Sequence, residues 1–133
     1  MEASIRIVTD SSCDLPPDVL SEFQIEVVPL NVHHGTDVYR DGELSLEAFW
    51  EKAAGPQPLR TSQPAPGAFD QVFERLVAQG QQVLCLTITS KHSGTSIAAR
   101  LAARRFGQAV QVFDSLSLSL GLGLQALALH LDG

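Results

Sequence analysis

The sequence predicts an α/β fold of three layers, in which helices flank a mainly parallel sheet of about four strands. The chain has 133 residues, which is the size of one ordinary domain. Its apolar residues amount to 44% and its charged residues to 18%, which is enough to build a core and too little charge for a disordered chain. Short apolar runs alternate with helical patterns, as in crossovers between parallel strands. We therefore expect residues 1–133 to form one α/β domain.

The first half of the chain contains two predicted strands of the sheet. A β-branched run at 4–9 predicts the first strand, and the turn-forming residues 10–12 follow it. Residues 14–23 predict a helix, since proline fits the first turn of a helix. Residues 25–30 predict the second strand, and Ser45 caps a short helix further along the chain.

The second half begins with the Pro/Gly-rich residues 55–67, which hold four of the seven prolines. The patterned sequence on either side is too short for two domains, so we expect an ordered loop within one domain. A helix is predicted from Phe69 to a stop at Gly80, because apolar residues recur there at helical spacing. The pattern then predicts a buried strand at 82–89, a helix at 94–106 and a strand at 110–113.

The leucine-rich residues 116–131 fit two patterns. Strict alternation up to Leu124 favours a strand, whereas Ala126 and Ala128 favour a helix. We predict a helix that is apolar on two sides, so its second side should meet something outside this chain. One apolar stripe would contain Leu116, Leu120, Leu124, Leu127 and Leu131, and the second would contain Leu118, Leu122 and Leu129.

Charge and cysteine usage bound the possible partners. The net charge is −6 and no basic run compensates for it, which disfavours nucleic acid and anionic membrane surfaces. Cys13 and Cys85 lie far apart and match no metal or redox spacing, so we expect reduced thiols. The N-terminus has no export signal, and residues 116–131 are too short and too interrupted to span a membrane. These features predict a soluble, cytoplasmic protein without stable membrane insertion.

Hydroxyl residues gather after the predicted strands. The carboxyl ends of parallel strands meet at one edge of a sheet, where ligands bind, and Thr61 and Ser62 could reach the same edge. Any one of these hydroxyls is best explained as a helix cap. Their common edge nevertheless predicts a site for an anion such as carboxylate or phosphate. The hydroxyls at this edge are Ser11, Ser12, Ser90, Ser93, Thr95, Ser96 and Ser115.

Common enzyme motifs do not fit the sequence. No phosphate-binding GxxxxGK[ST] loop is present, and the glycine pattern at 121–126 lies well past its strand. Ser93 lacks the GxSxG elbow of a serine hydrolase, and the four histidines show no metal-ligand spacing. Asp10, Asp14 and Asp114 could hold Mg²⁺, but turn and capping roles explain them about as well. We predict no catalytic residue, no metal and no cofactor.

Five separated motifs resemble those of the DegV family, in order and in spacing. They are Val8–Pro16 (VTDSSCDLP), Val28-Pro29-Leu30, Thr61-Ser62-Gln63-Pro64, Ser93-Gly94-Thr95 and Phe113-Asp114-Ser115, with Gly121 and Gly123 in the following helix. The resemblance covers nearly the whole chain. It implies a bacterial lipid-binding protein whose full members have two α/β domains, with a long-chain fatty acid in a tunnel between them. It also implies a non-catalytic subunit that presents the acyl carboxylate to a fatty acid kinase.

Matched to the family's motifs, Thr61 and Ser93 would bind the fatty acid carboxylate. Ser62, Gly94 and Thr95 would be secondary ligands or N–H donors. The chain departs from the family at Ala65, where a serine is usual, and at His92, where an apolar residue is common.

The resemblance also implies that the chain corresponds to the family's first domain and that the second, C-terminal domain is absent. The head-group site would then be present and the tunnel incomplete. Two other functions stay open. One is an α/β enzyme domain that handles a phosphate or nucleotide at the same edge, and the other is a ligand-free, truncated scaffold. Such a scaffold would self-associate through Leu118, Leu122 and Leu129 of the C-terminal helix.

Overall fold

The computed structural model describes residues 4–65 and 67–132, and their centre is a four-stranded parallel sheet, here the main sheet. Its strands are β1 (Ile5–Asp10), β2 (Glu26–Val28), β6 (Gln82–Thr87) and β7 (Val110–Asp114). They lie in the order β2-β1-β6-β7, and all three pairings are parallel. The predicted fold class is therefore confirmed.

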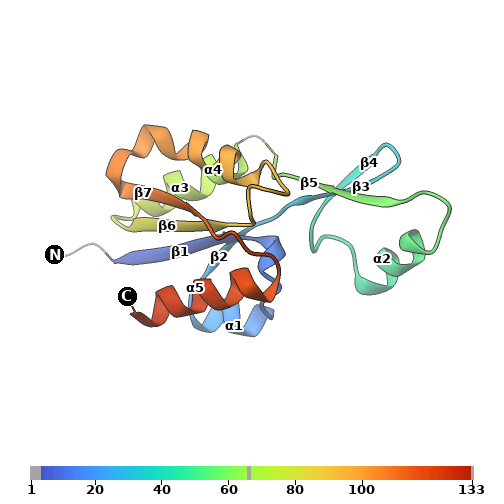
Figure 1. The fold of residues 1–133 in the computed structure, drawn as a ribbon, viewed down its shortest axis with the longest axis horizontal. Helices are drawn as coiled ribbons and strands as arrows, with labels where there is room; N and C mark the ends of the chain where they lie inside the picture. Colours follow the sequence, from blue (N-terminus) through green and yellow to red (C-terminus); the bar gives the residue numbers. More distant parts are fainter. Residues whose placement is uncertain (1–3, 66, 133) are drawn as a thin grey trace.

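Helices cover both faces of the main sheet, as Figure 1 shows. One face packs against α3 (Ala68–Ala78) and α4 (Thr95–Ala103). The other face packs against α5 (Leu120–Asp132), with α1 (Pro17–Glu22) beside it. Side chains alternate along each strand, so Val8 of β1 enters the core under α3 and α4 while Ile7 enters the core under α5.

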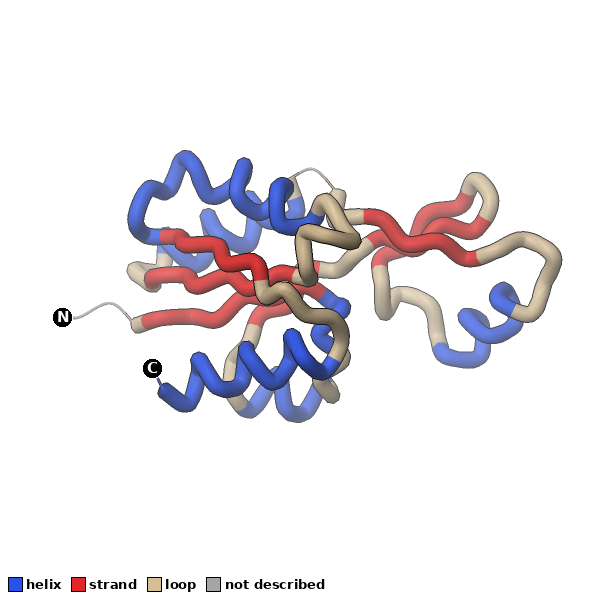
Figure 2. Tube along the Cα trace, in the orientation of Figure 1, coloured by secondary structure: helices blue, strands red, loops and turns tan. Residues whose placement is uncertain are grey.

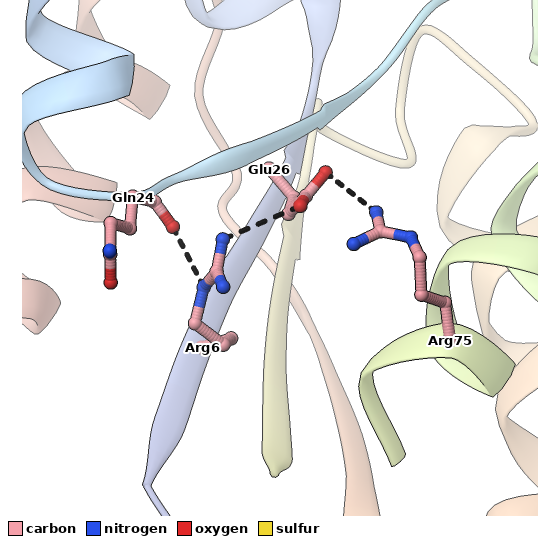
Figure 3. Close-up of polar contacts among 4 residues, drawn as sticks. All are labelled: Arg6, Gln24, Glu26 and Arg75. Carbon is pink, nitrogen blue, oxygen red and sulfur yellow. Dashed lines mark hydrogen bonds and ion pairs between the residues drawn. The ribbon is translucent and has the colours of Figure 1, made fainter. Parts of the chain in front are cut away.

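A polar network fixes the edge strand β2 at one end of the main sheet (Figure 3). Arg6 on β1 donates from Nε to the carbonyl oxygen of Gln24 at 2.9 Å and contacts Glu26 Oε1 at 3.4 Å. The other carboxylate oxygen of Glu26 lies 3.0 Å from Arg75 Nη2 on α3. One half-buried carboxylate thus links two strands and a covering helix.

A second, antiparallel sheet projects from the main sheet, and residues 31–62 that build it are here called the arm (Figure 2). Its strands are β3 (Asn31–His34), β4 (Asp37–Arg40) and β5 (Leu59–Ser62), in the order β4-β3-β5. The arm also contains α2 (Leu46–Ala53), which Ser45 caps by accepting from the Ala48 N–H at 3.1 Å, as predicted.

The arm corrects the prediction of a loop at 55–67. Residues of β5 pair antiparallel with β3, with Thr61 opposite Val32 and Leu59 opposite His34. Prolines at 56, 58 and 64 stand on both sides of β5, where they delimit the strand without removing a ladder hydrogen bond. The segment is therefore a strand between two turns.

The other predicted elements are confirmed with shifted ends. The second strand is shorter than 25–30, because the chain leaves the main sheet after Val28 and enters the arm. The strand at 82–89 ends at Thr87. The helix predicted at 94–106 begins at Thr95 and turns at Arg104 into a 3₁₀ segment that contains Gly107 at φ 56°.

Helix α5 begins at Leu120, and its buried side is the stripe that was predicted to be free. Leu122 and Ala126 are fully buried, and Leu129 packs against them. Leu116 and Leu124 are 67% and 63% exposed. The predicted self-association contact of Leu118, Leu122 and Leu129 is wrong for Leu122 and Leu129, because both pack into the core of the chain itself. Leu118 precedes α5 and is 49% exposed. The side chain of Leu131 lies outside the described residues.

Among residues 4–65 and 67–132, no helix combines the length and the apolar character that crossing a membrane requires.

Candidate functional site

A cavity of about 260 Å³ lies where the arm meets the loop between β6 and α4, and we call it the strand-end cavity. It brings together the two predicted ligand residues Thr61 and Ser93, which are about 30 residues apart in the sequence. The eight lining residues include no Asp, Glu, Lys or Arg. They are Leu30, Thr61, Ser62, Gln63, Ile88, His92, Ser93 and Gly94.

Ser93 is held at the start of α4 by its neighbour Thr95. Ser93 Oγ accepts a hydrogen bond from the Thr95 N–H at 3.2 Å and lies 2.7 Å from Thr95 Oγ1. Thr95 is fully buried, whereas Ser93 is partly exposed and lines the cavity. The structure thus places Ser93 on the cavity wall and Thr95 behind it as its support.

Thr61 and Ser62 point to opposite faces of the arm sheet, because side chains alternate along a strand. Ser62 Oγ lies 2.7 Å from His33 Nε2, which places it on the face that carries His33. Thr61 is paired with Val32 and shares the opposite face with it. Of these two hydroxyls, Ser62 already has a side-chain partner. No sequence pattern indicates the His33 contact, because it depends on the pairing of β3 with β5.

Gly94 lies against the side chain of Gln63. A Cβ atom added at Gly94 would overlap Gln63 Oε1. The absence of a side chain at position 94 therefore lets the segment at Gln63 approach the start of α4. Both residues line the cavity.

Asp10 and Ser11, at the end of β1, hold the backbone of two residues that line the cavity, and these contacts were not predicted. Asp10 Oδ2 accepts a hydrogen bond from the Ile88 N–H at 2.7 Å, and Ser11 Oγ accepts one from the Leu30 N–H at 2.9 Å. Asp10 Oδ1 also accepts from the Ser12 N–H at 3.0 Å, as predicted for a turn residue. Asp10 is fully buried, and burial raises the pKa of its carboxyl group.

Several hydroxyls that were predicted at the same edge serve local turns instead. Ser12 Oγ donates to Asp10, and Ser115 Oγ accepts from the Ser117 N–H at 3.1 Å. Ser96 is buried within α4, and Ser90 is exposed but lies outside the lining. Of the two departures from the family pattern, His92 lines the strand-end cavity and Ala65 lines two neighbouring pockets.

The aspartates that could have held Mg²⁺ accept hydrogen bonds from hydroxyl and N–H groups of the chain. Asp14 accepts from Ser119 Oγ at 2.6 Å, and Asp114 accepts from the N–H groups of Ser90 and Leu116. Within the part of the chain that the structure describes, His, Cys, Asp and Glu side chains form no group of three or more that could hold a metal ion.

The chemistry available in the strand-end cavity is hydrogen bonding to an anion. Its hydroxyl and amide groups are uncharged donors, and Ser93 and Gly94 lie at the N-terminus of α4, which favours negative charge. The Ser62–His33 contact pairs a hydroxyl with an imidazole. An imidazole within hydrogen-bond distance of a hydroxyl is the arrangement that a general base and a nucleophile require, and it was not predicted.

Comparison with known proteins identifies relatives of the chain. The family model described as "Uncharacterised protein, DegV family" matches residues 4–130. A DegV domain-containing protein of Deinococcus radiodurans is 43% identical over 126 residues, and one of Lactococcus lactis is 38% identical over 112 residues. These matches cover 93% and 84% of this chain but only 45% and 40% of the relatives.

Solved structures of DegV proteins share the fold. A fatty-acid-binding DegV family protein from Thermus thermophilus is 36% identical, with a TM-score of 0.87 over 96% of this chain and 46% of its own. DegV from Bacillus subtilis, described as a fatty acid binding protein, is 28% identical, with a TM-score of 0.86 over 97% of this chain and 47% of its own. The chain spans less than half the length of these relatives. From the family match over residues 4–130 and the shared fold, we conclude that the chain belongs to the DegV family.

Proposed function

We propose that the chain binds a long-chain fatty acid, holds its carboxylate with Thr61 and Ser93 in the strand-end cavity, and presents that carboxylate to a fatty acid kinase. The observation that carries the proposal is that these two hydroxyls line one cavity whose lining contains no Asp, Glu, Lys or Arg. Related structures at 36% and 28% identity are described as fatty-acid-binding proteins. Ser62, Gly94 and Thr95 act as secondary donors or supports.

The size of the cavity suits the head of the ligand. Pockets that enclose a small molecule usually measure about 300–1,000 Å³. The strand-end cavity, at about 260 Å³, therefore accommodates the carboxylate and the beginning of the chain. The remaining tail lies against other apolar surface, which we place in the second domain of full-length relatives.

Neutral donors fit a ligand that must be handed on. Burial of about 14 methylene groups contributes about 11 kcal/mol, at about 0.8 kcal/mol each, before the costs of ordering. The tail can supply most of the affinity, so the head needs orientation more than strong attraction. A bidentate arginine would hold the carboxylate harder than hydroxyls do. Thr61, Ser62 and His92 are exposed, which leaves the head group accessible to a second protein.

The test is a double substitution, Thr61→Val with Ser93→Ala, which removes both hydroxyls and keeps the size of the side chains similar. Fatty acid retained by the purified protein is measured by lipid extraction and mass spectrometry. Two lost hydrogen bonds to a charged group cost about 3 kcal/mol, so we expect affinity to fall about 100-fold. Circular dichroism checks that the variant stays folded.

The matched control is Thr36→Val with Ser21→Ala, because both of these hydroxyls are exposed and lie outside the strand-end cavity. Unchanged fatty acid retention in the Thr61/Ser93 variant would refute the proposed ligand residues. A nucleotide or sugar phosphate in place of a fatty acid would instead support a phosphate-handling domain. Turnover of an acyl ester that is lost on Ser62→Ala would show that the chain is an enzyme.

A further inference from the structure

Two consecutive residues at the end of β1 hold both apolar walls of the strand-end cavity. Leu30 and Ile88 are the two apolar side chains among the eight lining residues. Leu30 follows β2 and Ile88 follows β6, the strands that flank β1 on either side in the main sheet. Ser11 bonds the backbone of Leu30 and Asp10 bonds the backbone of Ile88. The end of β1 thus lies between the segments of Leu30 and Ile88 and accepts a hydrogen bond from each.

We propose that Asp10 and Ser11 are positioning residues, which fix the separation of Leu30 and Ile88 and thereby select an unbranched chain next to the carboxylate. The inference rests on the proposed function and adds the class of acid that the site takes. The first carbons of the ligand must pass between these two walls on leaving Thr61 and Ser93. A methyl branch on the carbon beside the carboxylate would meet one of them.

The strength of the two bonds follows from their surroundings. Asp10 is fully buried. If it lost a hydrogen-bond donor, the carboxylate would stay buried without that hydrogen bond, which costs free energy. Its three accepted bonds, from Ser12 N, Ser12 Oγ and Ile88 N, hold its side chain in one orientation. The rise in the pKa of this carboxyl group through burial is consistent with an interior, fixed position. Leu30 is itself buried, and its hydrogen bond to Ser11 is partly buried.

The experiment compares the affinity of the whole chain for hexadecanoic acid and for 2-methylhexadecanoic acid. One extra methyl group in a fitted pocket changes affinity about tenfold or more, so we expect the wild type to prefer the unbranched acid by about that factor. In Ser11→Ala and in Asp10→Asn, the ratio of the affinities for the unbranched and the branched acid should fall to about threefold or less, because Leu30 and Ile88 can then move apart. A general loss of stability would weaken both acids equally and leave the ratio unchanged.

The matched control is Asp14→Asn, in the same loop. Asp14 bonds Ser119 and touches no wall of the cavity, and asparagine tolerates its φ of 55°. This variant should keep the wild-type ratio. Binding of neither acid by the wild type would refute the proposed function itself. Binding by the wild type without discrimination, or with an unchanged ratio in both wall variants, would refute the positioning role alone.

Amide hydrogen exchange of the wild-type chain without ligand provides a second measurement that needs no variant. The N–H groups of Leu30 and Ile88 should exchange slowly, because a side-chain acceptor holds each of them. Exchange at the rate of an unprotected amide at both positions would overturn the proposal even if neither variant folds.

Discussion

At the scale of single residues, Asp10 and Asp114 show how burial decides the behaviour of a carboxylate. Each ends a strand of the main sheet and accepts backbone hydrogen bonds from the turn that follows. Asp10 is buried, and the loss of hydration raises its pKa. Asp114 is little buried, so hydrogen bonds from Ser90 and Leu116 outweigh the effect of lost hydration. They lower the pKa of its carboxyl group.

The lowered pKa of Asp114 predicts an acid-dependent contribution to stability. A group whose pKa is lower in the folded state stabilises that state above its ordinary pKa of 3.8 and loses this effect as the pH falls through the lowered value. Asp114→Asn should therefore reduce the free energy of unfolding by a constant amount from pH 7 to about pH 5, and by progressively less below about pH 4. Urea unfolding of both proteins across this range provides the measurement. A deficit in the variant that grows as the pH falls would contradict the prediction.

The candidate site could be predicted at this scale only in part. Hydroxyls that follow strands are visible in the sequence, and Ser93 follows β6 of the parallel sheet. Thr61 reaches the same cavity from the arm, where β5 pairs antiparallel with β3. The hydrogen bond between Asp10 and Ile88 joins residues 78 positions apart. It follows from β6 lying beside β1, and no local pattern encodes that neighbour. Likewise, only the strand pairing of the arm shows that Thr61 and Ser62 face opposite ways.

At the scale of elements, α5 sits on the turn after β1 at Gly123. A Cβ atom at Gly123 would lie 2.6 Å from the carbonyl oxygen of Cys13 and 2.9 Å from the side chain of Leu15. Cys13 belongs to the short 3₁₀ helix η1 (Ser11–Cys13), which follows Asp10 directly. The glycine therefore permits a close contact between α5 and the segment that holds the walls of the cavity.

Gly123→Ala should destabilise the protein by about 1–3 kcal/mol, because the backbone of Cys13 cannot move aside as a flexible side chain would. Gly121→Ala is the matched control. Its Cβ would lie 3.2 Å from Ser117 Cβ at an exposed position, and its effect should stay within about 1 kcal/mol. Chemical unfolding measures both variants. Equal stability of the two alanine variants would argue against a close contact at Gly123.

The elements that were predicted correctly have strong periodic signals, and those that were missed do not. Helix α3 carries Phe69, Phe73 and Leu76 at helical spacing, and all three are buried. Strand β5 has four residues between prolines, so turn signals on both sides outweigh its short pattern. For α5 the helix was predicted, but two apolar stripes left its orientation open, and packing against β1 decides between them.

At the scale of the whole molecule, exposed leucines mark the start of α5 and the loop before it. Leu120 and Leu124 lie about one turn apart on α5, whereas Leu116 and Leu118 belong to the loop between β7 and α5. All four are at least 49% exposed. An exposed apolar surface is typical of a contact with another polypeptide. In full-length relatives, which are more than twice as long, we propose that the second domain covers it.

Without such a cover, the same surface predicts self-association of this chain. Sedimentation velocity at several concentrations should show an average mass that rises with concentration. Leu120→Glu with Leu124→Glu should abolish the rise, because two charges cannot be buried without partners, while the exposed positions tolerate them in the monomer. Leu122→Glu is unsuitable for this test because it would charge the core. A wild-type chain that stays monomeric throughout would contradict the prediction.

The order of strands in the main sheet has a consequence for synthesis on the ribosome. Ile5 of the central strand pairs with Gln82, almost 80 residues later, so one side of β1 is without its neighbour until β6 has left the exit tunnel. Bringing such distant segments together lowers the entropy of the chain before any favourable contact forms. Parallel sheets of this kind are therefore slow to form. Until β6 has emerged, the nascent chain exposes the unpaired side of β1, and we expect chaperones to bind it during that time.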